Sequence, residues 1–327
     1  MQLQLHAAVD AAGDEHHPAG EFHAWFSYCT RGTPANRLDP LRADAIDGST
    51  MPPGTMRALT LNCWNISPPF EERMALIRAG IEALAPDLVA LQEIIVRRDG
   101  FDQAAVILDG LGYHRVFGAA LRWDDTGTLL PLDAHADGAG NVIAARWPIV
   151  RSALHPLPGV DGEERRSVLL ALVDTPAGRL PFVTTHLEWR FDHGHVRERQ
   201  VLALAGLVAD WSRDAPLPVV LVGDFNAEPD ATEMRFLRGL ATLAGRSTYF
   251  QDAWQLAGDG GRGTTWDNRN PYAAAMFEPD RRIDYLLVGA PDREGRGWIE
   301  TARVVFDTGH DGVFPSDHFG VLADVRV

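Results

Sequence analysis

Residues 221–230 read Leu-Val-Gly-Asp-Phe-Asn-Ala-Glu-Pro-Asp. The apolar run from Val219 to Val222 predicts a buried strand, and the residues that follow place a carboxylate and a carboxamide at the strand's end. A carboxylate there can accept a proton, and an amide can stabilise a developing negative charge. Asp224 and Asn226 are therefore typical of a hydrolase. The alternative interpretation is an Asx turn that merely ends a strand.

The composition predicts a folded, globular protein. The chain has 327 residues, of which 46% are hydrophobic, and this is enough for a substantial core. No apolar stretch approaches the roughly eighteen residues of a membrane span, and the N-terminus lacks the features of a signal peptide. We therefore expect a cytoplasmic protein without a transmembrane segment. The two cysteines, Cys29 and Cys63, indicate neither a disulfide framework nor a zinc cluster, so a metal would be bound by oxygen ligands.

The charge pattern bears on the substrate. The formal net charge is −15, the chain contains no Lys, and no run of Arg exceeds two residues. A protein that binds nucleic acid non-specifically usually carries a basic stripe. Nucleic acid is therefore a disfavoured partner, although a local patch of Arg would still permit it.

The chain divides into two regions by composition. Residues 1–56 are rich in His, Pro, Gly and Asp and contain one aromatic patch at residues 22–28. We interpret them as an N-terminal extension whose patch could add an edge strand. Residues 57–327 contain many strands, few helices and no internal repeat, which favours a single large α/β domain.

Polar residues end the first two predicted strands. Residues 58–65 predict a strand with Asn62 and Asn65 near its end, and residues 88–93 predict a second strand that ends at Glu93. A helical apolar stripe lies between them. A βαβ unit brings the ends of its parallel strands to one edge of the sheet, so Asn62 and Glu93 should emerge together. For Glu93 alone, a surface salt bridge is the simpler interpretation.

Further strands also carry polar residues at their ends. They are predicted at residues 140–149, 167–174, 179–185, 219–222, 282–288 and 321–327. His186 directly follows one of them, and Asp284 lies on an otherwise apolar run. Asp317 and His318 come just before the last strand. A single histidine at a strand end is more often structural, so His186 alone indicates little.

Taken in order, six short motifs resemble those of the endonuclease/exonuclease/phosphatase superfamily. These metal-dependent phosphoesterases include neutral sphingomyelinases, DNase I-like nucleases and inositol phosphatases. The motifs are Leu61-Asn62-Cys63-Trp64, Leu91-Gln92-Glu93, Thr185-His186-Leu187, Gly223-Asp224-Phe225-Asn226, Arg282-Ile283-Asp284-Tyr285 and Ser316-Asp317-His318. Each is weak alone, but all six in this order are improbable by chance. The resemblance implies a four-layer α/β/β/α sandwich of two mixed β-sheets flanked by helices over residues 57–327.

The resemblance also implies a Mg²⁺ or Mn²⁺ site. Asn62, Glu93 and Asp317 supply hard oxygen ligands, which suit these ions, and the metal would act as a Lewis acid on a phosphate. Spacing alone does not decide between Asn62 and Asn65. Asn62 is preferred because the motif around it resembles the neutral sphingomyelinase form. One ion or two would both be compatible with this ligand set.

Five residues receive catalytic roles from the resemblance: His186, Asp224, Asn226, Asp284 and His318. Asp224 would orient and deprotonate the attacking water, and Asn226 would help to fix the phosphate oxygens. The two histidines would donate to the charge on phosphorus. Asp284 would hold His318 in the correct tautomer and favour its cationic form.

The substrate is predicted less precisely than the type of reaction. Candidate substrate contacts are Asn141, Arg166, Trp189 and Trp266. The leading hypothesis is a hydrolase of phosphodiesters or phosphomonoesters in a small molecule or a lipid head group. A nuclease acting on DNA or RNA is the enzymatic alternative, and a catalytically silent binding scaffold is the alternative from another class. The leaving group and the oligomeric state do not follow from the sequence.

Overall fold

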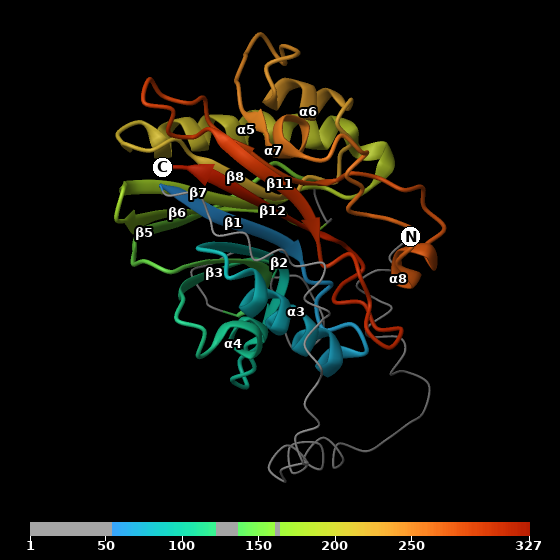
Figure 1. Ribbon diagram of the computed structural model, residues 1–327. Coiled ribbons are helices and arrows are strands. Elements are labelled where there is room, and N and C mark those ends of the chain that lie inside the picture. Colours follow the sequence, from blue (N-terminus) through green and yellow to red (C-terminus); the bar gives the residue numbers. More distant parts are fainter. Residues whose placement is uncertain (1–53, 122–136, 161–163) are drawn as a thin grey trace. The chain divides into compact units, whose positions relative to one another are not determined.

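Two six-stranded β-sheets form the framework of the computed structural model, which describes residues 54–121, 137–160 and 164–327 (Figure 1). The predicted N-terminal extension lies outside the described residues as far as residue 53, including its aromatic patch at residues 22–28. The first described strand begins at Thr55.

The first sheet has the strand order β11-β12-β1-β2-β4-β3. Its strands are β1 (Thr55–Asn62), β2 (Leu88–Val96), β3 (His114–Leu121), β4 (Gly138–Ala145), β11 (Ile299–Val305) and β12 (Gly320–Arg326). β1 and β2 are parallel and are joined by helix α3 (Phe70–Leu84), so the predicted βαβ unit is confirmed. The other pairs in this sheet are antiparallel.

The second sheet has the strand order β5-β6-β7-β8-β10-β9. Its strands are β5 (Ile149–Pro156), β6 (Ser167–Thr175), β7 (Gly178–His186), β8 (Val220–Asp224), β9 (Gln251–Asp252) and β10 (Asp284–Val288). The hairpin predicted from the sequence is β6–β7. β7 and β8 are parallel and are joined by helix α5 (Gly194–Ser212), whereas the other pairs are antiparallel.

The sheets pack face to face, and helices cover their outer faces. Val220 and Val222 of β8 belong to the core between the sheets, together with residues of β1, β2 and β4. Val219 and Leu221 point the other way and pack against α5. This alternation follows from the two-residue period of a strand. Figure 1 shows α5 and α6 (Thr232–Leu237) on one side, and α3 and α4 (Gln103–Leu108) on the other. The predicted four-layer sandwich is confirmed.

Shorter elements complete the described part of the chain: η2 (Phe191–His193), α7 (Ala253–Ala257) and α8 (Pro271–Ala274). No helix among the described residues is long and apolar enough to cross a membrane.

One predicted strand is divided in the structure. The run at residues 140–149 was expected to be continuous, but β4 ends at Ala145 and β5 begins at Ile149. Pro148 lies between them, and a proline has no N–H with which to continue a ladder. Asn141 therefore lies inside β4 rather than at a strand opening.

Candidate active site

The predicted polar residues meet at one end of the two facing sheets. β1 ends at Asn62, which pairs with Gln92 of β2 in the parallel register, and Glu93 follows Gln92 directly. On the second sheet, Asp224 lies next to His186 on one side and next to Asp284 on the other. Because β7 and β8 are parallel while β10 runs the opposite way, two strand ends and one strand start converge at this edge. The sequence-predicted residues are thus brought together by the topology.

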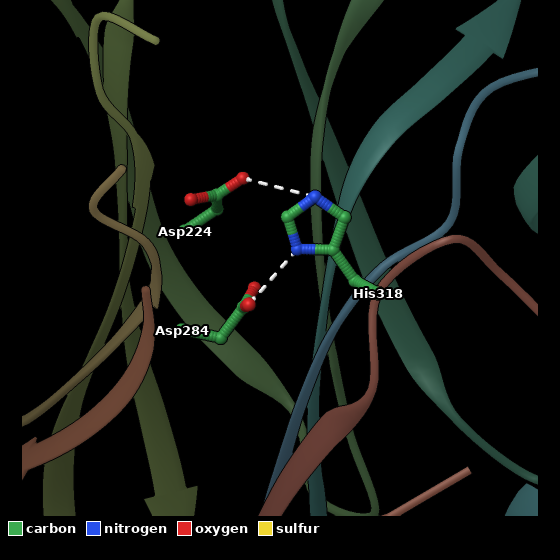
Figure 2. Close-up of side chains that lie close together, drawn as sticks. All are labelled: Asp224, Asp284 and His318. Carbon is green, nitrogen blue, oxygen red and sulfur yellow. Dashed lines mark hydrogen bonds and ion pairs between the residues drawn. The ribbon is translucent and has the colours of Figure 1, made fainter. Parts of the chain in front are cut away.

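A carboxylate–imidazole–carboxylate chain lies at the centre of the site (Figure 2). His318 Nδ1 is 2.9 Å from Asp284 Oδ2, and His318 Nε2 is 3.8 Å from Asp224 Oδ2. The predicted pairing of Asp284 with His318 is confirmed. All three side chains are buried, and their ligand atoms lie within 4.8 Å of one another, so the cluster is also a candidate metal site.

Asp224 accepts hydrogen bonds from both sheets. Asn62 Nδ2 donates to its Oδ2 at 3.1 Å, and the backbone N–H of Asn226 donates to its Oδ1 at 2.9 Å. His186 Nε2 lies 3.4 Å from Oδ2. Burial, together with the charge of Asp284, raises the pKa of Asp224 to about 7. A carboxylate with such a pKa is a stronger base than an exposed one at neutral pH.

The two histidines differ in charge. Burial opposes the charged form of His318, but the carboxylates of Asp284 and Asp224 outweigh it and raise the pKa of His318 to about 10. Burial, the nearby guanidinium of Arg166 and the charge of His318 lower the pKa of His186 well below its usual value. The site thus holds one cationic and one neutral imidazole at neutral pH.

Asn226 has a positive φ of 51°, which is a conformation that asparagine tolerates better than most residues. Its side-chain amide donates to the carbonyl of Leu187 at 3.1 Å. The residue therefore ties the loop after β8 to the loop after β7. Its side chain is 8% exposed, so it lies at the border of the site.

Glu93 lies at a break in the β2–β4 ladder, between the pairs formed by Leu91 and Ile94, and its φ is 56°. This irregularity turns its carboxylate toward the site rather than along the sheet. Asn62 donates to Oε1 at 3.2 Å, and Asn65 donates to Oε2 at 3.0 Å. Both asparagines therefore contact Glu93, but in the described residues Asn62 alone also reaches Asp224.

Asp317 fits a site for a hard cation. Its Oδ1 lies 3.2 Å from the hydroxyl oxygen of Ser316, whose proton is donated to the carbonyl of Asn62 at 2.6 Å. Burial raises the pKa of Asp317 to about 6, with His318 acting in the opposite direction and Glu93 adding to the rise. Two carboxylates that repel each other in this way would both be stabilised by a divalent ion. The oxygen donors of Asn62, Glu93 and Asp317 fit Mg²⁺ better than the central cluster does, because a protonated His318 cannot act as a ligand.

The candidate substrate contacts fall into two groups. Three side-chain nitrogens are buried and have no hydrogen-bond partner within the described part of the chain: Asn141 Nδ2, Arg166 Nε and Trp266 Nε1. Arg166 is held by Glu164 at 3.2 Å, and the Trp266 ring lies edge-on to His318 with centroids 5.0 Å apart. Trp189 is only partly buried and lies under the guanidinium of Arg190.

The sequence reasoning missed several residues that shape the site. Thr265 Oγ1 accepts from the backbone N–H groups of Ile283 and Asp284 and so fixes the start of β10. Glu164 holds Arg166, as described above, and no sequence signal distinguishes it from a surface acid. Arg73 is completely buried in α3. It lies four residues before Ile77 on the apolar stripe, and this spacing could have revealed it.

Solved structures share this architecture. TDP2 from D. rerio in complex with a single-strand DNA product has a TM-score of 0.64 and 20% identity, over 84% of this chain and 99% of that one. The catalytic domain of human Nocturnin with a bound sulfate anion has a TM-score of 0.60 and 21% identity, over 83% of this chain and 93% of that one. The fold is therefore DNase I-like.

The sequence comparisons place the chain in a family. The sequence model of the Endonuclease/Exonuclease/phosphatase family matches residues 59–318, and the chain belongs to this family. Nocturnin from Xenopus laevis is 29% identical in an alignment 280 positions long that covers 78% of this chain and 64% of that protein. The chain thus spans less than two thirds of the length of this curated relative. The superfamily resemblance read from the six motifs is confirmed, but a particular closeness to sphingomyelinases is not shown.

Proposed function

We propose that the protein is a Mg²⁺- or Mn²⁺-dependent hydrolase of phosphoester bonds in small-molecule or lipid-like substrates. One observation carries the proposal. The buried carboxylate of Asp224 has a raised pKa and lies beside two imidazoles of different charge. This arrangement supplies a base and an adjacent cationic donor, which are the two groups that an in-line attack on a phosphoester requires.

Asn62, Glu93 and Asp317 are the residues that would hold the ion. When bound, it would polarise the phosphoryl oxygens and offset the negative charge that develops on them. The hydrogen bonds from Asn62 and Asn65 fix the Glu93 carboxylate before any ion arrives. The site is therefore largely organised by the protein itself.

The remaining residues supply proton transfer and orientation. Asp224 would take a proton from the attacking water, because its hydrogen bonds to Asn62 and Asn226 leave it fixed in position. His318, kept cationic by Asp284, would donate toward the phosphoryl oxygens. Asn141 Nδ2 and Arg166 Nε would bind further oxygens of the substrate, because they are buried without a partner among residues 54–121, 137–160 and 164–327, and such a donor is costly.

The substrate class has one enzymatic alternative. A nuclease is favoured by the solved TDP2 structure that holds a single-strand DNA product, and it is opposed by the net charge of −15. The likeness of residues 61–64 to the neutral sphingomyelinase form is a further hypothesis about the substrate. A catalytically silent scaffold is disfavoured because an unused site would not need to keep Asp224, Asp284 and His318 buried together.

A substrate panel tests the proposal. Bis-p-nitrophenyl phosphate, p-nitrophenyl phosphate, sphingomyelin and a single-stranded oligonucleotide would be incubated with the protein in Mg²⁺ and in EDTA. We expect metal-dependent release from at least one small or lipid substrate. Asp224→Asn protein, purified in parallel, controls for contaminating phosphatases. Faster turnover of the oligonucleotide would favour the nuclease, and no turnover of any ester would contradict the proposal.

A further inference from the structure

Helix α3 carries a buried arginine that bonds only to main-chain carbonyls. Arg73 is 0% exposed. Its Nε donates to the carbonyl of Pro315 at 3.2 Å, and its Nη2 donates to the carbonyl of Trp64 at 3.3 Å. Nη1 and Nη2 also donate to the carbonyls of Ser67 and Cys63. No carboxylate among the described residues hydrogen-bonds to this guanidinium, which is unusual for a buried cation.

The bonded carbonyls belong to the two loops that hold the proposed metal ligands. Residues 63–67 directly follow Asn62, and Pro315 lies two residues before Asp317. These loops are far apart in sequence, and Arg73 joins them from a helix outside both sheets. The Ser316 hydroxyl forms a second link between them, because it donates to the carbonyl of Asn62 at 2.6 Å.

The shape of the side chain explains why an arginine is needed here. A guanidinium is planar and directs its donors in fixed directions, whereas a lysine ammonium is a compact group with only three donors. The Trp64 ring lies 4.7 Å from Cζ of Arg73 and restricts the guanidinium further. Burial lowers the pKa of Arg73, and the charge of Asp317 acts in the opposite direction. The ligand carboxylate therefore helps to keep this cation stable.

We propose that Arg73 is a positioning residue for the metal site. By joining the two ligand loops, Arg73 sets the separation between Asn62 and Asp317 and thereby the affinity for a divalent ion. The inference rests on the proposed function, because it assigns the ion to these ligands. Arg73 does not contact the substrate. It acts through the main chain of the two ligand loops.

The test compares two buried arginines. Arg57 lies on β1, near the end opposite Asn62, where it donates to Asp324 at 2.7 Å and to the Leu84 carbonyl at 3.1 Å. Arg73→Lys and Arg57→Lys each keep the positive charge but remove the planar guanidinium with its fixed donor directions. Isothermal titration with Mg²⁺ and with Mn²⁺ would measure ion affinity, and hydrogen exchange would measure protection of residues 63–67 and 315–318.

We expect Arg73→Lys to weaken ion binding by about tenfold or more, the usual effect of losing a residue that orients metal ligands. Both loops should lose protection together, while the strands keep theirs. Arg57→Lys should lower the melting temperature without changing ion affinity. The inference would be overturned if Arg73→Lys bound the ions as tightly as the wild type, or if both arginine variants lost the same affinity. A wild type that binds neither ion would overturn it as well.

A second variant covers a failure of Arg73→Lys to fold. Ser316→Ala removes the other link between the same loops and should weaken Mg²⁺ binding in the same direction by a smaller factor. Unchanged affinity in Ser316→Ala would then count against the inference. A wild type that binds Mg²⁺ but hydrolyses no phosphoester would refute the proposed function alone, because ion affinity and loop protection still report on Arg73.

Discussion

The two halves of the site balance their charges differently. The first half consists of Asp224, Asp284 and His318. Its two carboxylates, both on the second sheet, lie on either side of the cationic ring of His318. The second half consists of Glu93 and Asp317 beside the first sheet. Glu93 accepts hydrogen bonds from neutral amides, and among the described residues no cation donates a hydrogen bond to either carboxylate. The first half is therefore neutralised by a cation in direct contact with its carboxylates, whereas the nearby cation of the second half, Arg73, donates its hydrogen bonds to main-chain carbonyls. This difference supports our proposal that proton transfer belongs to the first half and ion binding to the second.

Asp224→Asn tests the first half and should have the largest effect. The substitution keeps the shape and removes most of the basicity, so kcat should fall about 10²-fold or more with little change in KM. Folding should survive. Because burial raises the pKa of Asp224 to about 7, its ionised form is disfavoured in the folded state, and Asn at this position should leave the melting temperature at pH 8 unchanged or higher.

Steady-state kinetics at saturating Mg²⁺ and thermal unfolding would measure both effects. An Asx turn works about as well with Asn as with Asp. Wild-type turnover in well-folded Asp224→Asn protein would therefore remove Asp224 from the chemistry and leave it as a turn residue.

The charge on His318 should be visible in the pH dependence of stability. Its pKa rises to about 10 in the folded state, so its contribution is fully present below its unfolded value of roughly 6.5 and is lost as the pH rises through 10. Other groups add to this loss, because burial also raises the pKa of the Cys63 thiol, so a His318 variant is needed to isolate the contribution of the ring. The wild type should lose a few kcal/mol of unfolding free energy over this range.

Urea unfolding at several pH values would measure this loss in wild type and in His318→Gln. The variant should show a flatter dependence above pH 7. His114→Gln, at an exposed position, is the matched control and should follow the wild type. Parallel curves for wild type and His318→Gln would show that the ring is not cationic in the folded protein.

Much of the fold could be predicted from the sequence, but the sheet edges could not. The inner strands β4 and β8 are buried along their whole length and therefore appear as apolar runs. The edge strand β5 is largely exposed or half-buried, and β3 begins with two exposed residues. β9 is only two residues long, and the outer strand β11 is half-buried over most of its length. Edge strands need only one neighbour, so their sequences lack the pattern that reveals inner strands.

The site shows the same division between what sequence can and cannot predict. Asp224 and Glu93 could be predicted as site residues because a polar residue at the end of an apolar run can be recognised from the sequence alone. The break in β2 that turns Glu93 toward the site could not, since it depends on the ladder with β4. Arg73 was missed because a charged residue in a helix is usually assigned to the solvent face.

Glu93→Gln tests the second half of the comparison. The variant keeps a hydrogen-bonding side chain but loses the charge that a divalent ion needs, so the Mg²⁺ concentration for half-maximal activity should rise about tenfold or more. At saturating Mg²⁺, kcat should recover substantially. Titration of activity with Mg²⁺ measures this, and Glu82→Gln, on α3, is the control. A large loss of kcat that no Mg²⁺ concentration reverses would place Glu93 in proton transfer instead.

The smallest effect concerns the two asparagines and decides between them. Asn62 donates to Glu93 and to Asp224, so it bridges both halves, whereas Asn65 donates to Glu93 alone and is itself held by Ser67. Asn62→Ala should therefore lower kcat and Mg²⁺ affinity together, because it leaves the buried carboxylate of Asp224 and the half-buried carboxylate of Glu93 each short of a donor. Asn65→Ala should change Mg²⁺ affinity by only about two- to fivefold, the effect of losing one hydrogen bond of ordinary strength, and should leave kcat near wild type. Activity titrated with Mg²⁺ at saturating substrate separates the two parameters. If Asn65→Ala instead lowers kcat as much as Asn62→Ala does, Asn65 faces the reacting groups, and the division of the site into two halves fails at the residue that joins them.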